Sequence, residues 1–166
     1  MLRLFLLALL ANTPVTIDGM SATPPADWKS EPVTSSMRRA QFSLPHVAGE
    51  DRDAELAIFF FGEGQGGDAQ ANVERWKTLF QDAKPSKVTD FKVKNVKVTY
   101  FDISGTYLFK ARPVDPSLTA EKRPNHRMLA VVWESPHGPY FMRLVGPEKT
   151  VTKYKGAFDA WLKSFK

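Results

Sequence analysis

Two pairs of strand-like segments joined by very short turns constrain the fold of this chain more than any other feature. Segments 88–93 and 96–109 flank the turn Lys94-Asn95, and "MLAVVW" and "YFMRLV" flank the turn "SPHGP". Strands connected by so few residues run antiparallel, because a parallel pair needs a crossover of about a dozen residues or more. The sequence therefore predicts an antiparallel sheet and excludes a doubly wound parallel α/β fold.

Four further segments complete the predicted fold. Residues 37–45 alternate apolar and polar side chains, and the apolar "AELAIFFF" at 54–61 is typical of a central strand paired with them as a hairpin. Apolar residues recur at helical spacing from the N-cap Asp68 to Asp82, and again along "TVTKYKGAFDAWLKSFK". We predict an α+β fold in the order β-β-α-β-β-β-β-α, with about six antiparallel strands and two helices packed on them.

The N-terminus has the layout of a secretory signal. Arg3 precedes the apolar run 4–11, which is too short for a bilayer span of about 20 residues. We expect residues 1–22 to be a signal peptide, with cleavage after Ala22 as the first choice in a window that opens after Ala11. The mature protein is then periplasmic or extracellular, with no transmembrane span.

The remaining domain boundaries follow from the prolines. Residues 23–36 hold three prolines and several small polar residues, so we expect an extended lead-in. A single α+β domain then spans 37–166. In the alternative interpretation, Met20 is the true start of a cytoplasmic protein.

The composition narrows the classes of function. The chain has no cysteine, which removes disulfides, thiolate nucleophiles, cysteine metal sites and a lipid anchor through cysteine. The formal net charge of +5 favours anionic neighbours such as envelope polymers, phospholipid headgroups or acidic proteins. The basic residues are scattered along the chain, so we do not expect nucleic acid as a partner.

A glycine-rich stretch raises the question of a phosphate cradle. Gly62, Gly64 and Gly67 match G-x-G-x-x-G between a strand and a helix. The dinucleotide fingerprint also needs a second, parallel strand that ends in an acidic residue, whereas here a hairpin follows and Asp82 lies at a helix end. We interpret the stretch as a turn in which the glycines supply positive φ, and we expect no cofactor.

Catalytic and metal-binding patterns are sparse. His46, His126 and His137 all fall in predicted loops without metal-ligand spacing, so we expect surface histidines and no metal site. Asp102 and Glu134 lie in apolar strands, where they are either an acid–base pair or outward-facing carboxylates.

The arginines admit two interpretations. A salt bridge from Arg143 to Asp102 or Glu134 would account for those carboxylates. Arg38, Arg39, Arg75 and Arg143 themselves either stack on aromatic rings or extend to solvent.

The strongest binding candidate is the segment 110–127. It holds three prolines, shows neither helical nor strand periodicity, and is therefore predicted to be a long loop. A mobile basic loop above a sheet can dock an anionic ligand or partner, although a solvated crossover explains the segment as well. The candidate binding residues are Arg112, Lys122, Arg123, His126 and Arg127.

The closing "FDAWLKSFK" and the "ISGTY" strand at 103–107, together with the order of elements, resemble the PsbP-like α/β/α sandwich superfamily, which includes the bacterial DcrB-like envelope proteins. The resemblance covers roughly residues 37–166. It implies a non-enzymatic accessory or binding domain, often in the envelope, and carries over no functional residue. We therefore expect an exported non-enzymatic binding or accessory protein of the bacterial cell envelope. The alternative is a small cofactor-binding enzyme or hydrolase that uses the glycine loop 62–67 or the Asp102 and Glu134 pair.

Overall fold

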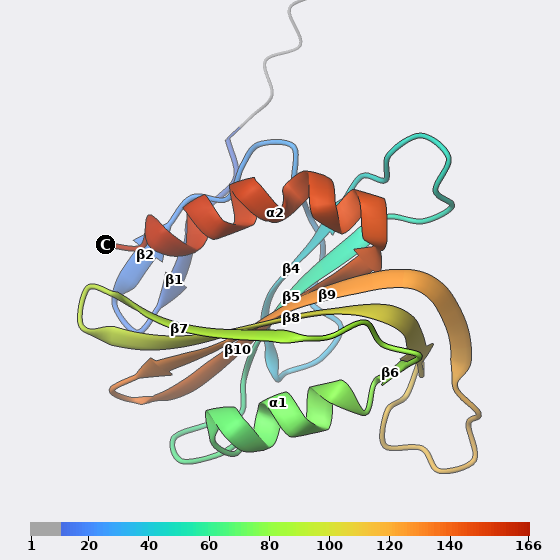
Figure 1. The fold of residues 1–166 in the computed structure, drawn as a ribbon. Coiled ribbons are helices and arrows are strands. Elements are labelled where there is room, and N and C mark those ends of the chain that lie inside the picture. Colours follow the sequence, from blue (N-terminus) through green and yellow to red (C-terminus); the bar gives the residue numbers. More distant parts are fainter. Residues whose placement is uncertain (1–10) are drawn as a thin grey trace, which may run out of the picture.

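A twisted antiparallel sheet with one helix on each face dominates the computed structural model, which describes residues 11–166 (Figure 1). The strand order is β3-β4-β5-β10-β9-β8-β6, and β7 pairs with β8 beside β6. These strands are β3 (Lys29–Ser30), β4 (Arg38–Leu44), β5 (Ala54–Phe60), β6 (Phe80–Gln81), β7 (Lys87–Val93), β8 (Val96–Phe109), β9 (Glu121–Ser135) and β10 (Gly138–Pro147). The helices are α1 (Ala69–Lys77) and α2 (Glu148–Lys163).

The predicted fold class is confirmed. Every strand pair in the sheet is antiparallel, and six long strands and two helices follow one another in the predicted order. The predicted turn at Lys94-Asn95 joins β7 to β8, with Lys94 at φ 53°. The first helix was expected to reach Asp82, but it ends at Lys77 because Phe80 pairs with Tyr107 of β8 and starts the short strand β6.

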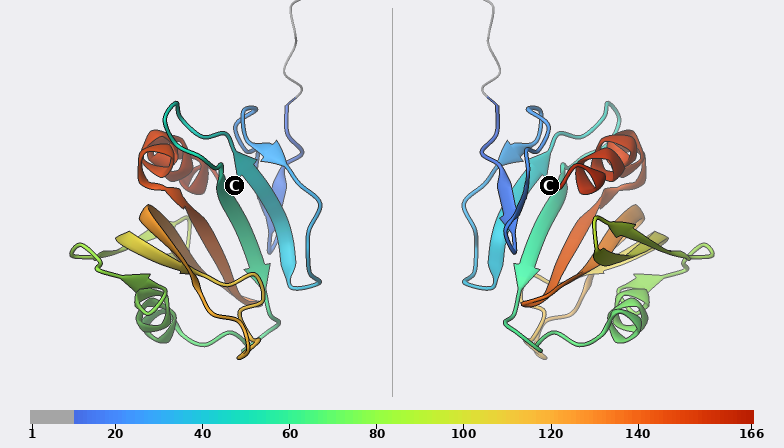
Figure 2. Two further views of the ribbon diagram at one scale, coloured as in Figure 1. Left: turned by 90° about the vertical axis from the view of Figure 1, so that its right-hand side faces the viewer. Right: turned by 90° about the vertical axis from the view of Figure 1, so that its left-hand side faces the viewer.

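Each helix covers its own apolar layer. Under α2 lie buried side chains from β4, β5, β8, β9 and β10, such as Leu56, Leu129 and Leu144. Under α1 lies a smaller layer in which Trp76 stacks on Phe101 of β8 with ring centroids 6.3 Å apart. Figure 2 shows that α1 lies below the β8 side of the sheet, away from β4 and β5. The part of that face formed by β4 therefore has no helix over it.

The folded domain begins earlier than predicted. A hairpin of β1 (Val15–Ile17) and β2 (Met20–Ala22) packs into the α2 layer, where the side chain of Ile17 is 1% exposed. The hairpin is also tied to the C-terminus, since Ser21 and Lys166 exchange backbone hydrogen bonds of 2.9 and 3.2 Å. The predicted domain start at 37 is therefore wrong, because short elements with few apolar residues give little sequence pattern.

The expected lead-in 23–36 also belongs to the domain. Trp28 is fully buried in the α2 layer, and β3 extends the sheet beside β4. Residues 1–10 of the expected signal peptide lie outside the described residues, so the leader stays a prediction. Cleavage after Ala22 would remove part of this core.

The expected loop 110–127 is in part a strand. β9 already begins at Glu121, and its first residues pair with the end of β8 from Phe109 back to Gly105. The register shifts between Gly105 and Tyr107, and Asn125 has φ 52°, so a bulge interrupts the alternation of side chains. Because apolar and polar residues do not alternate regularly across this bulge, the strand was not predicted. Within residues 11–166, no helix is long and apolar enough to cross a membrane.

Candidate anion-binding groove

The five predicted binding residues do not form one basic patch. Arg112 pairs with Asp115 at 3.2 Å, and Arg123 pairs with Glu121 at 3.0 Å while its guanidinium lies 3.6 Å from the centroid of the Phe109 ring. Arg127 on β9 donates two hydrogen bonds, of 2.9 and 2.7 Å, to the carboxylate oxygens of Asp102 on β8. Lys122 is the one cation of this set without an ion pair among the described residues.

His126 is a buried residue of a strand, which corrects its prediction as a surface histidine in a loop. It lies on β9, is 5% exposed, and stacks on Tyr107 with an angle of 13° between the rings. Its Nδ1 lies 2.9 Å from the carbonyl oxygen of Pro124, and its Nε2 is buried without a partner among the described residues. Burial lowers the pKa of His126 because it disfavours the charged imidazolium.

The structure instead presents a groove of about 350 Å³ between α2 and the β7–β8 hairpin. Cross-strand pairing places Lys87, Thr89 and Phe91 of β7 on the same face of the sheet as the buried side chains of β8 below α2. The side chains that line the groove are Lys87, Thr89, Phe91, Tyr100, Asp102, Lys155, Asp159 and Lys163.

Three of the lining residues form a hydrogen-bonded polar cluster. The hydroxyl of Tyr100 donates to Asp159 on α2 at 2.7 Å, and Nζ of Lys155 lies 2.5 Å from the other oxygen of the same carboxylate. Burial and the neighbouring carboxylate raise the pKa of Tyr100 far above its usual value. Tyr100 is therefore a protonated hydrogen-bond donor at neutral pH, and it offers no phenolate for catalysis.

The charges around the groove do not cancel. Asp102 is paired with Arg127 and Asp159 with Lys155, which leaves Lys87 and Lys163 without a carboxylate within 4 Å among the described residues. Nζ of Lys163 lies 5.8 Å from the centroid of the Phe91 ring. The groove thus combines an aromatic surface with two uncompensated ammonium groups, which is suited to an anion with an apolar body.

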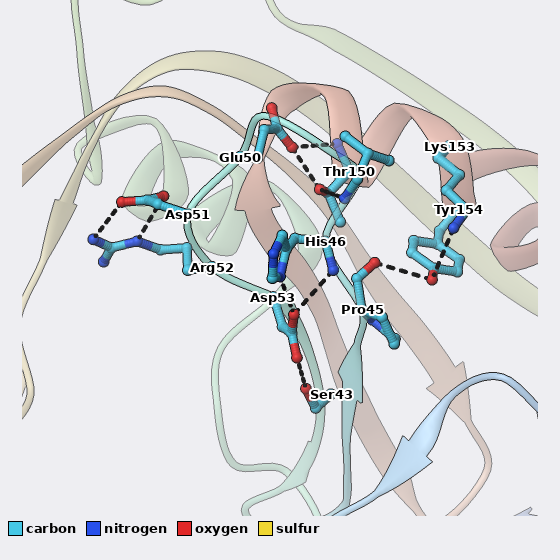
Figure 3. Close-up of polar contacts among 11 residues, drawn as sticks. Ser43, Pro45, His46, Glu50, Asp51, Arg52, Asp53, Thr150, Lys153 and Tyr154 are labelled. Atoms are coloured by element: carbon cyan, nitrogen blue, oxygen red, sulfur yellow. Dashed lines mark hydrogen bonds and ion pairs between the residues drawn. The ribbon is translucent and has the colours of Figure 1, made fainter.

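Contacts from the β4–β5 loop hold the N-terminal end of α2 in place (Figure 3). The helix starts after Pro147, which supplies no side-chain cap, so its first backbone N–H groups need other partners. Glu50 takes this role by accepting from the backbone N–H groups of Lys149 at 3.0 Å and Thr150 at 2.8 Å. The hydroxyl of Tyr154 donates to the carbonyl of Pro45 at 3.1 Å. These contacts fix the helix that forms one wall of the groove.

The proposed acid–base pair of Asp102 and Glu134 does not exist. Asp102 lies opposite Leu129 on the α2 face of the sheet, whereas Glu134 lies opposite Lys97 on the other face, 4.0 Å from its Nζ. The expected salt bridge from Arg143 to one of these carboxylates is also wrong, since Arg127 and Lys97 take those positions. Side chains alternate between faces along a strand, and the sequence alone did not supply the register between β8 and β9.

The glycine-rich stretch is a turn. Gly62, Gly64, Gly66 and Gly67 all have positive φ. The side-chain amide of buried Asn72 donates to the carbonyl oxygens of Gly66 and Asp68, both at 2.8 Å. Asp68 caps α1 as predicted and accepts from the backbone N–H of Ala71 at 2.8 Å. Gly66 also allows close packing, because a Cβ there would lie 2.5 Å from the ring of Phe141.

Comparisons with known proteins identify the fold. No family model matches the chain, and no curated protein matches it in sequence. One similar solved structure is protein PA94 of unknown function from Pseudomonas aeruginosa, described as a putative regulator, with 14% identity, a TM-score of 0.52, and coverage of 92% of this chain and 94% of that chain. Another is cyanobacterial PsbP from Synechocystis sp. PCC 6803, with 14% identity, a TM-score of 0.53, and coverage of 93% and 91%. The chain therefore has a PsbP-like fold, as its resemblance implied.

Proposed function

We propose that this chain is an exported, non-enzymatic binding or accessory protein of the bacterial cell envelope that holds an anionic group in the groove between α2 and β7–β8. The observation that carries the proposal is that Lys87 and Lys163 line one groove, that Nζ of Lys163 lies 5.8 Å from the centroid of the Phe91 ring, and that neither ammonium group has a carboxylate partner among the described residues. Charge-assisted hydrogen bonds from two such donors contribute about 1.5–3 kcal/mol each when they are formed.

The groove favours binding over catalysis. Both of its carboxylates already accept from cations, and its tyrosine is held protonated. A general base would need a free acceptor at the operating pH. We therefore propose no catalytic residue in the groove and assign its lysines to ligand binding.

Export rests on the sequence of the N-terminus. A basic residue followed by a short apolar run favours secretion, and the net charge of +5 suits an anionic envelope. The fold limits where such a leader can end. The Asn12 side chain donates to the carbonyls of Pro25 at 2.7 Å and Trp28 at 2.8 Å, so we place cleavage after Ala11 rather than after Ala22.

Export is tested by fractionating a bacterium that expresses the full chain with a C-terminal tag, followed by N-terminal sequencing of the product. We expect an envelope fraction whose first residue is Asn12. An intact leader in the cytoplasmic fraction would contradict export, and a product that starts at Thr23 would contradict the proposed cleavage position.

Binding is tested by thermal unfolding of residues 12–166 against glycerol phosphate, anionic polymers, nucleotides and metal ions. An anion at 100 times its dissociation constant adds about 2.7 kcal/mol, which raises the midpoint by about 5–10 °C for a chain of this length. We expect Lys87→Met and Lys163→Met to remove the shift. The matched control is Lys92→Met, because Lys92 lies on the same strand as Lys87 but on the other face of the sheet. A shift with nucleotide or metal ions alone would contradict the proposal and support the enzyme alternative.

A further inference from the structure

Arg143 lies on the α1 face of the sheet, between Phe141 and Val145, which pack in the layer under α1. It sits in the middle of β10, opposite Ala57 on β5 and Ala130 on β9, so small side chains flank it on both sides. Its guanidinium carbon lies 5.1 Å from the centroid of the Phe59 ring, and that of Arg38 lies at the same distance from the same ring. Two guanidinium groups therefore share one aromatic ring at the surface of the sheet.

Arg143 has no counter-ion. Among residues 11–166, no carboxylate oxygen lies within 4 Å of its guanidinium, and no hydrogen bond joins it to an acceptor. Glu55, whose carboxylate acts on the charge of Arg143, already accepts two hydrogen bonds: Arg38 donates to one of its oxygens at 2.9 Å and Gln41 to the other at 3.3 Å. Burial and the charges of Arg38 and Arg75 lower the pKa of Arg143.

The Arg143 side chain is half-buried rather than fully enclosed. Its nitrogens are not among the fully buried polar atoms that lack a partner in the described part of the chain. A partly desolvated cation without a counter-ion destabilises a fold. An anion bound at Arg143 would supply that counter-ion and remove the cost. The planar fork of an arginine matches the two oxygens of a carboxylate or a phosphate.

Aromatic rings continue from the arginines across this face. Phe59 stacks on Phe61 with centroids 6.0 Å apart, and Phe61 lies 5.5 Å from Phe141. Phe61 is 37% exposed, although large apolar side chains are usually buried. The glycine-rich turn borders the row, since Gly66 packs against Phe141 and Phe61. An apolar chain attached to the anion has a surface here on which to lie.

We propose that Arg143, together with Arg38, binds the oxyanion of a small amphiphile, a phosphate or carboxylate that carries an alkyl chain, and that the chain packs on Phe59 and Phe61. This site lies on the opposite face of the sheet from the α2 groove and is independent of it. Charge complementarity selects the anion, because Arg143 feels the positive charges of Arg38 and Arg75, while the one carboxylate that acts on it, that of Glu55, is paired with Arg38.

The test is calorimetric titration of residues 12–166 with octyl phosphate, with inorganic phosphate as the chain-free probe. Arg143→Met should weaken binding of octyl phosphate about tenfold or more, the effect expected for the loss of a charge-assisted contact. Glu55→Gln should strengthen binding several-fold, because it removes the competing carboxylate and releases Arg38. The matched control is Arg39→Met, since Arg39 is exposed and lies over Phe60 on the other face, 5.3 Å from the ring centroid.

Two further readouts separate a ligand site from a structural role. In buffer without phosphate or carboxylate, Arg143→Met should unfold at a higher temperature than the wild type, because the substitution removes an unpaired and partly desolvated charge. Octyl phosphate also suits the groove, so the titrations are repeated in the Lys163→Met background, where the binding that remains should still be lost in Arg143→Met; this distinguishes the site from the groove. The proposal is overturned if Arg143→Met binds like the wild type, if Glu55→Gln binds more weakly, or if inorganic phosphate binds as tightly as octyl phosphate.

Discussion

Substitution of Ile17 tests whether the N-terminal hairpin belongs to the folded domain or to a removable leader. The side chain is 1% exposed in the layer under α2, so Ile17→Ala removes three fully buried carbons. At about 0.8 kcal/mol for each carbon, the transfer free energy alone is about 2.4 kcal/mol. The cavity left behind adds to this, so we expect a loss of about 2.5–4 kcal/mol. That is a large fraction of the about 5–15 kcal/mol that stabilises a typical domain.

The assay is urea unfolding of residues 12–166 monitored by tryptophan fluorescence, because Trp28 lies in the same layer as Ile17. The matched control is Thr16→Val, an outward-facing neighbour on the same strand, which should change the free energy of unfolding by no more than about 0.5 kcal/mol. Equal free energies of unfolding for Ile17→Ala and Thr16→Val would refute the placement of the hairpin in the core. The cleavage position proposed after Ala11 would lose its support with it.

Three further sites carry predictions. The pKa of His126 is lower in the folded protein than its unfolded value of about 6.5. Stability is therefore unaffected by this histidine above that pH and decreases as the pH falls below it, because the unfolded chain then binds a proton that the folded protein does not. The thermal midpoint of the wild type should fall between pH 7 and pH 5, and that of His126→Phe should fall less. Gly66→Ala should cost about 1–3 kcal/mol in urea unfolding because of its positive φ and the clash with Phe141, whereas Gly156→Ala, in an open position on α2, should add about 0.5–1 kcal/mol. Tyr100→Phe should cost about 1–3 kcal/mol by the same assay, because its hydroxyl donates to a carboxylate.

The long strands and the helices could be predicted because their patterns lie within short stretches of the sequence. The turn at Lys94-Asn95 joins strands close in sequence, and the apolar face of α2 follows a helical period with Tyr154, Phe158 and Trp161 all buried. The short strands β1, β2, β3 and β6 were missed, because each is only two or three residues long and gives too few residues for a pattern. No sequence pattern predicts the backbone hydrogen bonds that join Ser21, in the N-terminal hairpin, to Lys166 at the C-terminus.

The candidate sites could not be predicted because charge pairing depends on register. Arg127 was expected to be available for a ligand, but the pairing of β8 with β9 brings Asp102 next to it. Conversely, Lys87 and Lys163 are far apart in sequence and line one groove only because α2 packs beside the β7–β8 hairpin. Stacking of Arg143 on an aromatic ring was one of two interpretations of the sequence. The ring that it meets is Phe59 of the neighbouring strand.

The most direct test of the proposed function is to map an anion onto the surface of the ¹⁵N-labelled protein, residues 12–166, by titration with glycerol phosphate. Our account predicts that the largest amide shifts fall in 87–91, 100–102 and 155–163, the segments that line the groove, and that Lys163→Met removes them while Lys92→Met keeps them. Shifts confined to other surfaces, or the same shifts in both variants, would contradict the assignment of the groove as the anion-binding site.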